Sequence, residues 1–394
     1  MNGRMEDRLF VPGRLAGYGA ALLAMYVVIF AGGIWGRSWL FDANGALAFL
    51  DFVWIWLAAT FALVGDATTV YDHVAFAAAQ VPYVELSRKG FPYYHFVYPP
   101  TLLLFIAPLG LLPYVAAFTI WMLSTALLYL YAIYRIVPRA VVFLLALLPL
   151  PFAQNLFLGQ TGFLLAGLLG LALGLMARRP YLAGMCLGLL TYKPQFGLIF
   201  PIVLLVTWQW RVIVGAAVTV AMLFFAVSAF YGMAAWDGYL RTLRGTNVGT
   251  FMSDENLNAI IQTAFGVMHW AGASLGTKWT VYVVVSLLTT TLVCVICRRP
   301  VSDSLKAAAL GIGALTVTPY MLAYDLTALA VPVAFLTQEG LASGFLPGER
   351  FTLVGCFLAV FLMPLMPVGP LILAILMILL LRRVFRQESE RSTV

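Results

Sequence analysis

The sequence has very little charge and almost no histidine. Of its 394 residues only 10% are Asp, Glu, Lys or Arg, 63% are hydrophobic, and three are histidines. Soluble globular proteins carry about 25% charged residues, so this composition excludes an ordinary soluble domain. We therefore expect an integral membrane protein.

The motifs of common soluble enzymes are absent as well. The chain has no GxxxxGK[ST], HExxH or GxSxG, and no GxGxxG that opens a strand–helix unit. ATP or nucleotide-sugar chemistry therefore lacks its usual residues, and a lipid-borne substrate that arrives through the membrane fits better. No internal repeat is visible, which argues against a secondary transporter built from two duplicated bundles.

The cysteines and the net charge argue against a zinc site and against a nucleic-acid partner. Cys294 and Cys297 form a CxxC with no second pair or histidine nearby, which does not predict a zinc site. We expect the cysteines to pack inside the protein, with juxtamembrane lipidation of Cys297 as the alternative. The net charge of +7 comes from basic residues beside apolar runs, where they set membrane topology, so we predict no nucleic-acid partner.

What the chain does contain is a series of long apolar runs, at 15–35, 140–152, 163–176, 212–230 and 281–296. About 20 apolar residues form a helix that crosses the roughly 30 Å of hydrocarbon in a bilayer. The first run follows three arginines, as a signal peptide would, but it is longer than the roughly 7–15 apolar residues of a signal core. We interpret it as a retained membrane span.

Lys and Arg in short connections mark the cytoplasmic side of a membrane protein. The basic residues that mark that side are Arg4, Arg8, Arg14, Arg135, Arg139, Arg178, Arg179, Arg211, Arg298, Arg299, Lys306, Arg350, Arg382, Arg383, Arg386 and Arg391. These clusters divide the chain into six hairpins, or about twelve crossings, with both termini in the cytoplasm. We expect one helical domain over 1–394, with external loops at 37–113 and 233–278.

Residues 181–208 illustrate how a predicted hairpin turns at its non-cytoplasmic end, which we call its tip. As one helix they would be about 42 Å long, too long for a single crossing without strong tilt. Pro194 breaks the run and Lys193 lies at the break. Because a charge at bilayer depth costs roughly 3 kcal/mol or more, Lys193 and Asp325 both need a compensating role. We predict a shared polar cavity on the non-cytoplasmic side.

Asp51 is the strongest catalytic candidate. It lies in the apolar and aromatic stretch from Ala48 to Trp56, which we expect to follow the membrane interface. A partly desolvated carboxylate there has a raised pKa and can act as a general base. The alternative is a carboxylate that simply faces water.

Other polar residues at the tips are candidates for substrate binding. Lys193 suits a phosphate, or it extends to the interface instead. Asp325 either pairs with Lys193 or binds substrate, and Asn155 and Gln160 either bind hydroxyl groups or cap helices. The aromatic segment 91–100 suits stacking on a sugar or anchoring at the interface. The full set of predicted substrate-binding residues is His95, Tyr98, Asn155, Gln160, Gln195, Asn256, Tyr320, Tyr324 and Asp325.

The order of these motifs resembles glycosyltransferase family 87, a polyprenol-phosphate-mannose-dependent group of the GT-C superfamily. The resemblance rests on Asp51 in its aromatic stretch, Tyr98-Pro99-Pro100, Gly159-Gln160, Lys193-Pro194 and Tyr324-Asp325, and it spans about residues 48 to 335. It implies a GT-C helical bundle with a catalytic aspartate in the first external loop. It also implies inverting transfer of a sugar from a polyprenyl phosphate donor, with Asp51 as the base and Lys193 at the leaving phosphate.

The sequence departs from the family at the fifth tip. Mycobacterial members look to have a histidine there, whereas this chain has no histidine from Thr318 to Leu322. His95 is the candidate to take its place. We predict no metal and no cofactor. The expected partners are a polyprenyl phosphate sugar, a glycolipid or glycan acceptor and the lipid bilayer, in a bacterial inner membrane with the active site outside the cytoplasm. The alternatives are a transporter or flippase of a lipid-linked or small solute, and a structural scaffold.

Overall fold

The computed structural model describes residues 12–36, 38–40, 51–81, 96–139, 146, 147, 149–245 and 260–392. All regular elements in these ranges are helical apart from one isolated β-bridge, which confirms the predicted all-α class for this part of the chain. Within these described ranges, five helical stretches are long and apolar enough to cross a membrane. They are α2 (Pro12–Trp35), α7 (Tyr114–Ile136), α13 (Trp210–Gly245), α16 (Leu275–Arg298) and the continuous pair η5 (Ala323–Leu329) and α18 (Ala330–Ser343).

The remaining helices are shorter or more polar. Those in the first half are α3 (Phe52–Leu63), α4 (Ala67–Val70), α5 (His73–Gln80), α6 (Thr101–Ile106), η1 (Ala107–Leu111), α9 (Pro149–Leu158) and α10 (Gly162–Leu175). Those in the second half are α11 (Pro180–Leu189), η2 (Leu190–Tyr192), η3 (Pro194–Gly197), α12 (Ile199–Val206), α15 (Ala264–Trp270), α17 (Asp303–Val317), α19 (Glu349–Ala359), η6 (Val360–Leu362) and α20 (Gly369–Ser392). The count of about twelve crossings therefore stays a prediction.

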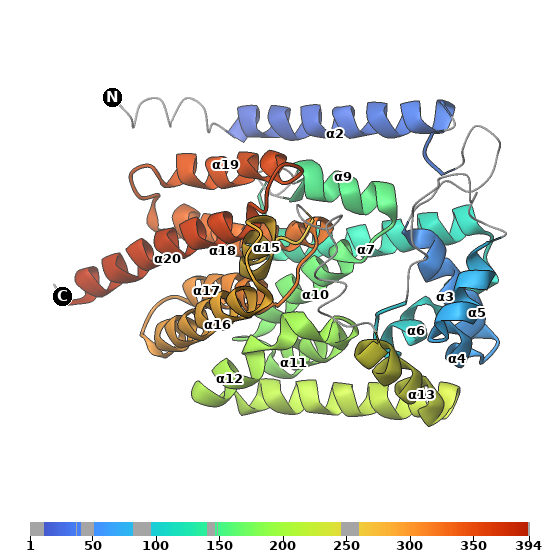
Figure 1. The fold of residues 1–394 in the computed structure, drawn as a ribbon. Helices are drawn as coiled ribbons and strands as arrows, with labels where there is room; N and C mark the ends of the chain where they lie inside the picture. Colours follow the sequence, from blue (N-terminus) through green and yellow to red (C-terminus); the bar gives the residue numbers. More distant parts are fainter. Residues whose placement is uncertain are drawn as a thin grey trace.

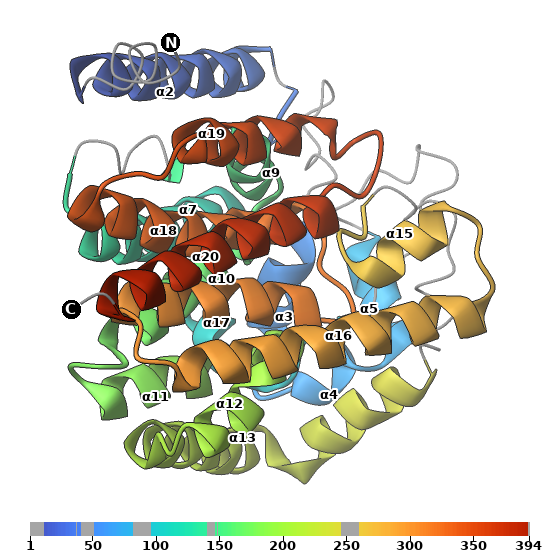
Figure 2. The same cartoon turned by 90° about the vertical axis from the view of Figure 1, so that its left-hand side faces the viewer.

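The helices form one bundle with α2 and α13 at opposite edges (Figures 1 and 2). Their outer faces carry many exposed apolar side chains, as a lipid-facing surface requires. In Figure 1 the start of α2 and the end of α20 lie at one end of the bundle, and α3, α4 and α5 lie at the other. This arrangement fits the predicted topology, in which both termini share one side and the first external loop is opposite.

Local sequence explains where several helices begin and bend. The side chains of Thr263, Ser274 and Ser302 each accept a hydrogen bond from a backbone N–H in the first turn of α15, α16 and α17. Pro180 occupies the first turn of α11, where its missing N–H costs nothing. Gly232 has φ of 72° and kinks α13.

The segment that precedes α15 is attached to the segment that precedes η5 by backbone contacts. Ile261 and Leu322 form an antiparallel bridge, and Gln262 donates its backbone N–H to the carbonyl of Met321 at 2.7 Å. The Gln262 side chain in turn accepts from the N–H of Gly369, at the start of α20, at 3.0 Å. These bonds fix the chain just before η5, the element that carries Asp325.

Candidate active site

Lys193 lies at a break between two short helical segments. Helix α11 tightens into η2, which ends at Tyr192, and Lys193 leaves the helical conformation with φ of −133° and ψ of 72°. Pro194 then begins η3 without an N–H to continue the helix. The predicted break is confirmed, and its Lys193 side chain points into the protein, only 4% exposed.

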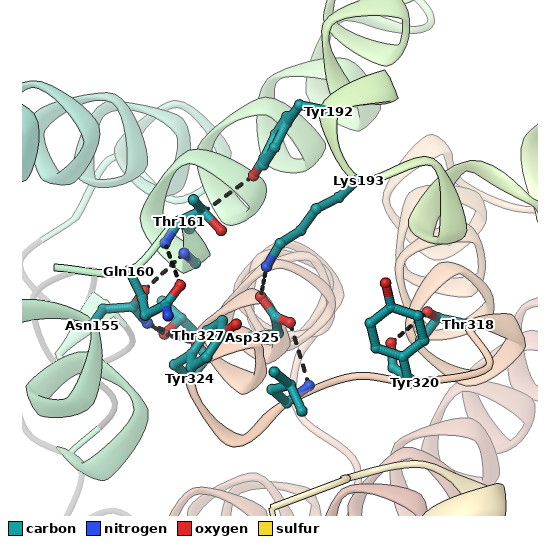
Figure 3. A network of polar contacts seen from close by, with 12 residues as sticks. Asn155, Gln160, Thr161, Tyr192, Lys193, Thr318, Tyr320, Tyr324, Asp325 and Thr327 are labelled. Carbon is teal, nitrogen blue, oxygen red and sulfur yellow. Dashed lines mark hydrogen bonds and ion pairs between the residues drawn. The ribbon is translucent and has the colours of Figure 1, made fainter. Parts of the chain in front are cut away.

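Lys193 forms a buried ion pair with Asp325. Its Nζ lies 2.6 Å from Oδ1 of Asp325, and both side chains are almost fully buried (Figure 3). The second carboxylate oxygen of Asp325 accepts a hydrogen bond from the N–H of Leu322 at 3.3 Å. Two buried charges are tolerated when each has such partners. The predicted alternative in which Asp325 pairs with Lys193 is therefore the arrangement that the structure shows.

Aromatic rings surround the ammonium group of Lys193. Its Nζ lies 4.9 Å from the ring centroid of Tyr324, 5.7 Å from that of Tyr98 and 6.0 Å from that of Phe196. A cation within about 6 Å of a ring face is attracted by the ring quadrupole. The positive charge is thus held in place by neutral rings on several sides and by the Asp325 carboxylate.

Asp51 immediately precedes α3 and lies outside the five long helical stretches. Its side chain makes no capping hydrogen bond to α3, and its Oδ2 instead accepts a hydrogen bond from Nε2 of Gln160. Desolvation raises the pKa of Asp51 to about 6, while the hydrogen bond from Gln160 acts in the opposite direction. At neutral pH such a carboxylate is mostly ionised and basic enough to accept a proton.

The turn between α9 and α10 aims Gln160 at Asp51. Gly159 in this turn has φ of +75°, a conformation that favours glycine, and its carbonyl accepts a hydrogen bond from Nε1 of Trp121 at 3.1 Å. A Cβ atom on Gly159 would lie 2.4 Å from Cβ of Phe52, the residue after Asp51. The turn and the start of α3 are therefore packed too closely for any side chain at position 159.

We expect Gly159→Ala to disturb Asp51 through this contact. Strain at positive φ and the clash with Phe52 together should lower the free energy of unfolding by about 2 kcal/mol or more. Any reaction that depends on Asp51 should slow about 100-fold, because small displacements of a reacting group are costly. Gly197→Ala is the matched control, since a Cβ there meets no atom within 4 Å. Equal thermal stability and activity of the two variants would contradict this role.

Tyr98 connects the Asp51 and Lys193 parts of the site. Its hydroxyl donates to Oε1 of Gln160 at 3.3 Å and lies 3.4 Å from Oγ1 of Thr161. Its ring is one of those around Lys193, and its carbonyl accepts from the hydroxyl of Tyr71 at 2.9 Å. A chain of direct contacts therefore runs from the Asp51 carboxylate to the Lys193 ammonium.

Asn155 holds neighbouring backbone rather than facing open space. It is fully buried, and its Nδ2 lies within hydrogen-bond distance of the carbonyls of Pro151 and Tyr324 and of Oγ1 of Thr327. Its Oδ1 accepts from the N–H of Gly162, the first residue of α10, at 2.8 Å. The predicted capping alternative is thus the one observed for Asn155, and direct substrate contact stays a prediction.

The other predicted substrate-binding residues are either partly exposed or outside the described part of the chain. Gln195 and Tyr320 are partly exposed, and Oγ1 of Thr318 donates to the carbonyl of Tyr320 at 3.0 Å (Figure 3). His95 and Asn256 lie outside the described residues. Among the residues that the structure does describe, no three His, Cys, Asp or Glu side chains are grouped so as to hold a metal ion, and metal independence stays a prediction.

Three residues near the site were not predicted from the sequence. Thr161 and Tyr192 are joined by a hydrogen bond from the Tyr192 hydroxyl to the Thr161 carbonyl at 3.1 Å. Tyr114 packs its ring 5.6 Å from that of Phe52, and its buried hydroxyl has no hydrogen-bond partner among the described residues. Tyr192 adjoins Lys193 in sequence, which was an available signal, whereas nothing in the sequence links Tyr114 to Asp51.

Most of these site residues lie in a part of the chain that matches a known protein family. The model of glycosyltransferase family 87 matches residues 96–324, more than half of the chain. The matched range includes Tyr98, Gln160, Lys193 and Tyr324, while Asp51 precedes it and Asp325 is the next residue after it. No curated protein and no solved structure matches.

Proposed function

We propose a specific reaction for this chain, which belongs to glycosyltransferase family 87 and is therefore a membrane glycosyltransferase. It transfers a hexose, which the family resemblance suggests is mannose, from a polyprenyl phosphate donor to a hydroxyl group of a glycolipid or glycan acceptor. The anomeric configuration is inverted. The observation that carries the proposal is the connected cluster in which a basic carboxylate, Asp51, and a buried cation, Lys193, are joined through Gln160 and Tyr98.

In this reaction the acceptor hydroxyl loses its proton to the Asp51 carboxylate and attacks the anomeric carbon of the donor. The bond between that carbon and the phosphate oxygen breaks, and its electron pair stays on the phosphate. Because the leaving phosphate is a stable anion, no general acid is needed. Lys193 stabilises the charge that grows on the phosphate in the transition state. Gln160 holds the carboxylate through Oδ2 and leaves Oδ1 for the acceptor proton.

The aromatic side chains around the cluster have a role in substrate binding under this proposal. Tyr98 and Tyr324 place their rings within about 6 Å of the Lys193 ammonium group, and such rings suit stacking against a sugar. Tyr320, which is partly exposed, is proposed as a third substrate-binding tyrosine. We place the site on the non-cytoplasmic side of a bacterial inner membrane, with both termini in the cytoplasm. In Figure 1 the start of α2 and the end of α20 lie at the same end of the bundle, which supports the placement of both termini on one side.

The proposal predicts a particular pH dependence. A general base must be deprotonated, so kcat/KM should fall as the pH drops through the pKa of Asp51, which lies at about 6. The Gln160 hydrogen bond lowers that pKa, so Gln160→Leu should raise it and move the acidic limb of the pH–rate profile to higher pH. Gln154→Leu is the matched control, because the buried Oε1 of Gln154 has no hydrogen-bond partner in the described chain. A limb that does not move in Gln160→Leu would count against Asp51 as the base.

Incubation of membranes with radiolabelled polyprenyl-phosphate sugars tests the donor class itself. Transfer of label to an acceptor by the wild type, and none by Asp51→Asn, is the expected result. Failure of every polyprenyl-phosphate sugar to act as donor would overturn the proposal.

A further inference from the structure

The Lys193 site already contains an anion before any donor binds. Asp325 neutralises Lys193 at 2.6 Å, and its other oxygen is fixed by the N–H of Leu322. Leu322 is itself placed by the bridge to Ile261. The carboxylate is therefore held by the backbone and cannot easily swing away when a phosphate approaches.

No second cation assists Lys193 in the part of the chain that the structure describes. Its three aromatic neighbours, Tyr98, Phe196 and Tyr324, are uncharged, and among the described residues its one hydrogen bond goes to Asp325. An ammonium group has three donors, so Lys193 can also donate a hydrogen bond to a phosphate oxygen without releasing Asp325. The pair of Lys193 and Asp325 is itself neutral, so a phosphate that binds to Lys193 adds its full negative charge to the pair.

The phosphate changes its charge during the proposed reaction. The donor is a phosphodiester with one negative charge, whereas the lipid phosphate left after transfer is a monoester with a second pKa near 6 and a charge of about −1.5 to −2 at pH 7. The additional negative charge appears when the bond to the anomeric carbon breaks. It lies beside a fixed carboxylate in a poorly solvated site, where like charges repel strongly.

We propose that Asp325 is a specificity residue that distinguishes the donor from the product at Lys193. It tolerates the singly charged phosphodiester and repels the doubly charged phosphomonoester, so that the spent lipid phosphate leaves. This inference rests on the proposed function, because it assumes a polyprenyl phosphate at Lys193. It concerns charge discrimination between ligands, which the proposed function does not require.

Binding measurements with two short lipid phosphates test the role of Asp325 separately from the proposed function. The probes are radiolabelled farnesyl phosphate, a monoester, and farnesyl methyl phosphate, a diester, with protein in nanodiscs. All variants carry Asp51→Asn, which prevents turnover and removes the titration of Asp51 from the comparison. At pH 8 we expect the diester to bind about tenfold more tightly than the monoester, and at pH 5, below the second phosphate pKa of about 6, we expect this preference to disappear.

Adding Asp325→Asn should abolish or reverse the preference at pH 8, chiefly by tightening binding of the monoester about tenfold or more. The amide still accepts a hydrogen bond from Leu322, and Asp72→Asn, which removes one charge from the first external loop, is the matched control. If Asp325→Asn does not fold, the pH comparison decides alone, and a preference that persists at pH 5 contradicts the inference. If both probes bind with no preference at pH 8, the inference fails and the donor class stands. If neither probe binds to folded protein, both fail.

Discussion

Asp51→Asn is expected to reduce sugar transfer by about 1,000-fold or more, because removal of a general base costs up to roughly four orders of magnitude. The amide cannot accept the proton of the acceptor hydroxyl at any accessible pH. Its oxygen can still accept the hydrogen bond from Gln160, so the local structure should persist. Membrane insertion, yield and thermal stability should therefore match those of the wild type while kcat falls.

The control for this variant comes from the same segment of the chain, residues 37–113, which we predict to be an external loop. Asp72 caps α5 by accepting hydrogen bonds from the N–H groups of Val74 and Ala75, both at 3.0 Å. Asn is as good a cap as Asp, so Asp72→Asn should retain both stability and transfer. Loss of transfer in Asp72→Asn, or its retention in Asp51→Asn, would mean that the loop acts in some other way.

Lys193→Met should have the second large effect, and on two properties at once. It removes the cation from the proposed phosphate site, and it leaves the buried Asp325 carboxylate without its partner. Removing one member of a buried pair costs about 3–5 kcal/mol of stability. We expect a marked fall in the thermal midpoint together with loss of sugar transfer.

The double variant Lys193→Met, Asp325→Asn separates these two effects. Neither side chain is then charged, and the amide oxygen at position 325 can still accept the Leu322 N–H, so most of the lost stability should return. Transfer should not return, because the cation at the leaving phosphate is still missing. Thermal unfolding and transfer assays on the single and double variants measure both properties. Recovery of transfer in the double variant would show that Lys193 has only a structural role.

The parts of the site that depend on neighbouring residues could be predicted from the sequence. Pro194 removes an N–H wherever it stands, and the adjoining Lys193 is costly in lipid, so the break and its polar surroundings followed from local rules. The class of the fold followed from composition in the same way. The resemblance to family 87 was confirmed by the match over residues 96–324.

Contacts between distant residues could only be offered as alternatives. Lys193 and Asp325 are 132 residues apart, and Gln160 and Asp51 are 109 residues apart, so no spacing rule connects them. The hydrogen bond from Gln160 to Asp51 was not predicted at all. For Asn155 the sequence also left two roles open, because the same side-chain amide can cap a helix or bind a substrate. The hydrogen bond from the N–H of Gly162 to this side chain corresponds to capping.

The predicted number of membrane crossings is larger than the number of long apolar helices in the described part of the chain. The positions of the basic residues predict about twelve crossings, whereas five stretches in the described part of the chain have the length and hydropathy expected of a full span. Several other apolar helices are shorter, among them α10, α11 and α12. We predict that tandem short helices such as α11 and α12, which lie on either side of the break at Lys193, form one hairpin without either being a standard span. Their separate crossings stay a prediction.

The most direct test of the central claim is to supply the purified protein, reconstituted in sealed vesicles, with a panel of polyprenyl-phosphate sugars radiolabelled in the sugar. Chromatography of the products before and after glycosidase treatment shows whether a new glycosidic bond has formed. We expect label in such a bond with at least one donor for the wild type, and with no donor for Asp51→Asn. Movement of intact labelled lipid or solute across the vesicle membrane with no new glycosidic bond would contradict it and would favour the transporter.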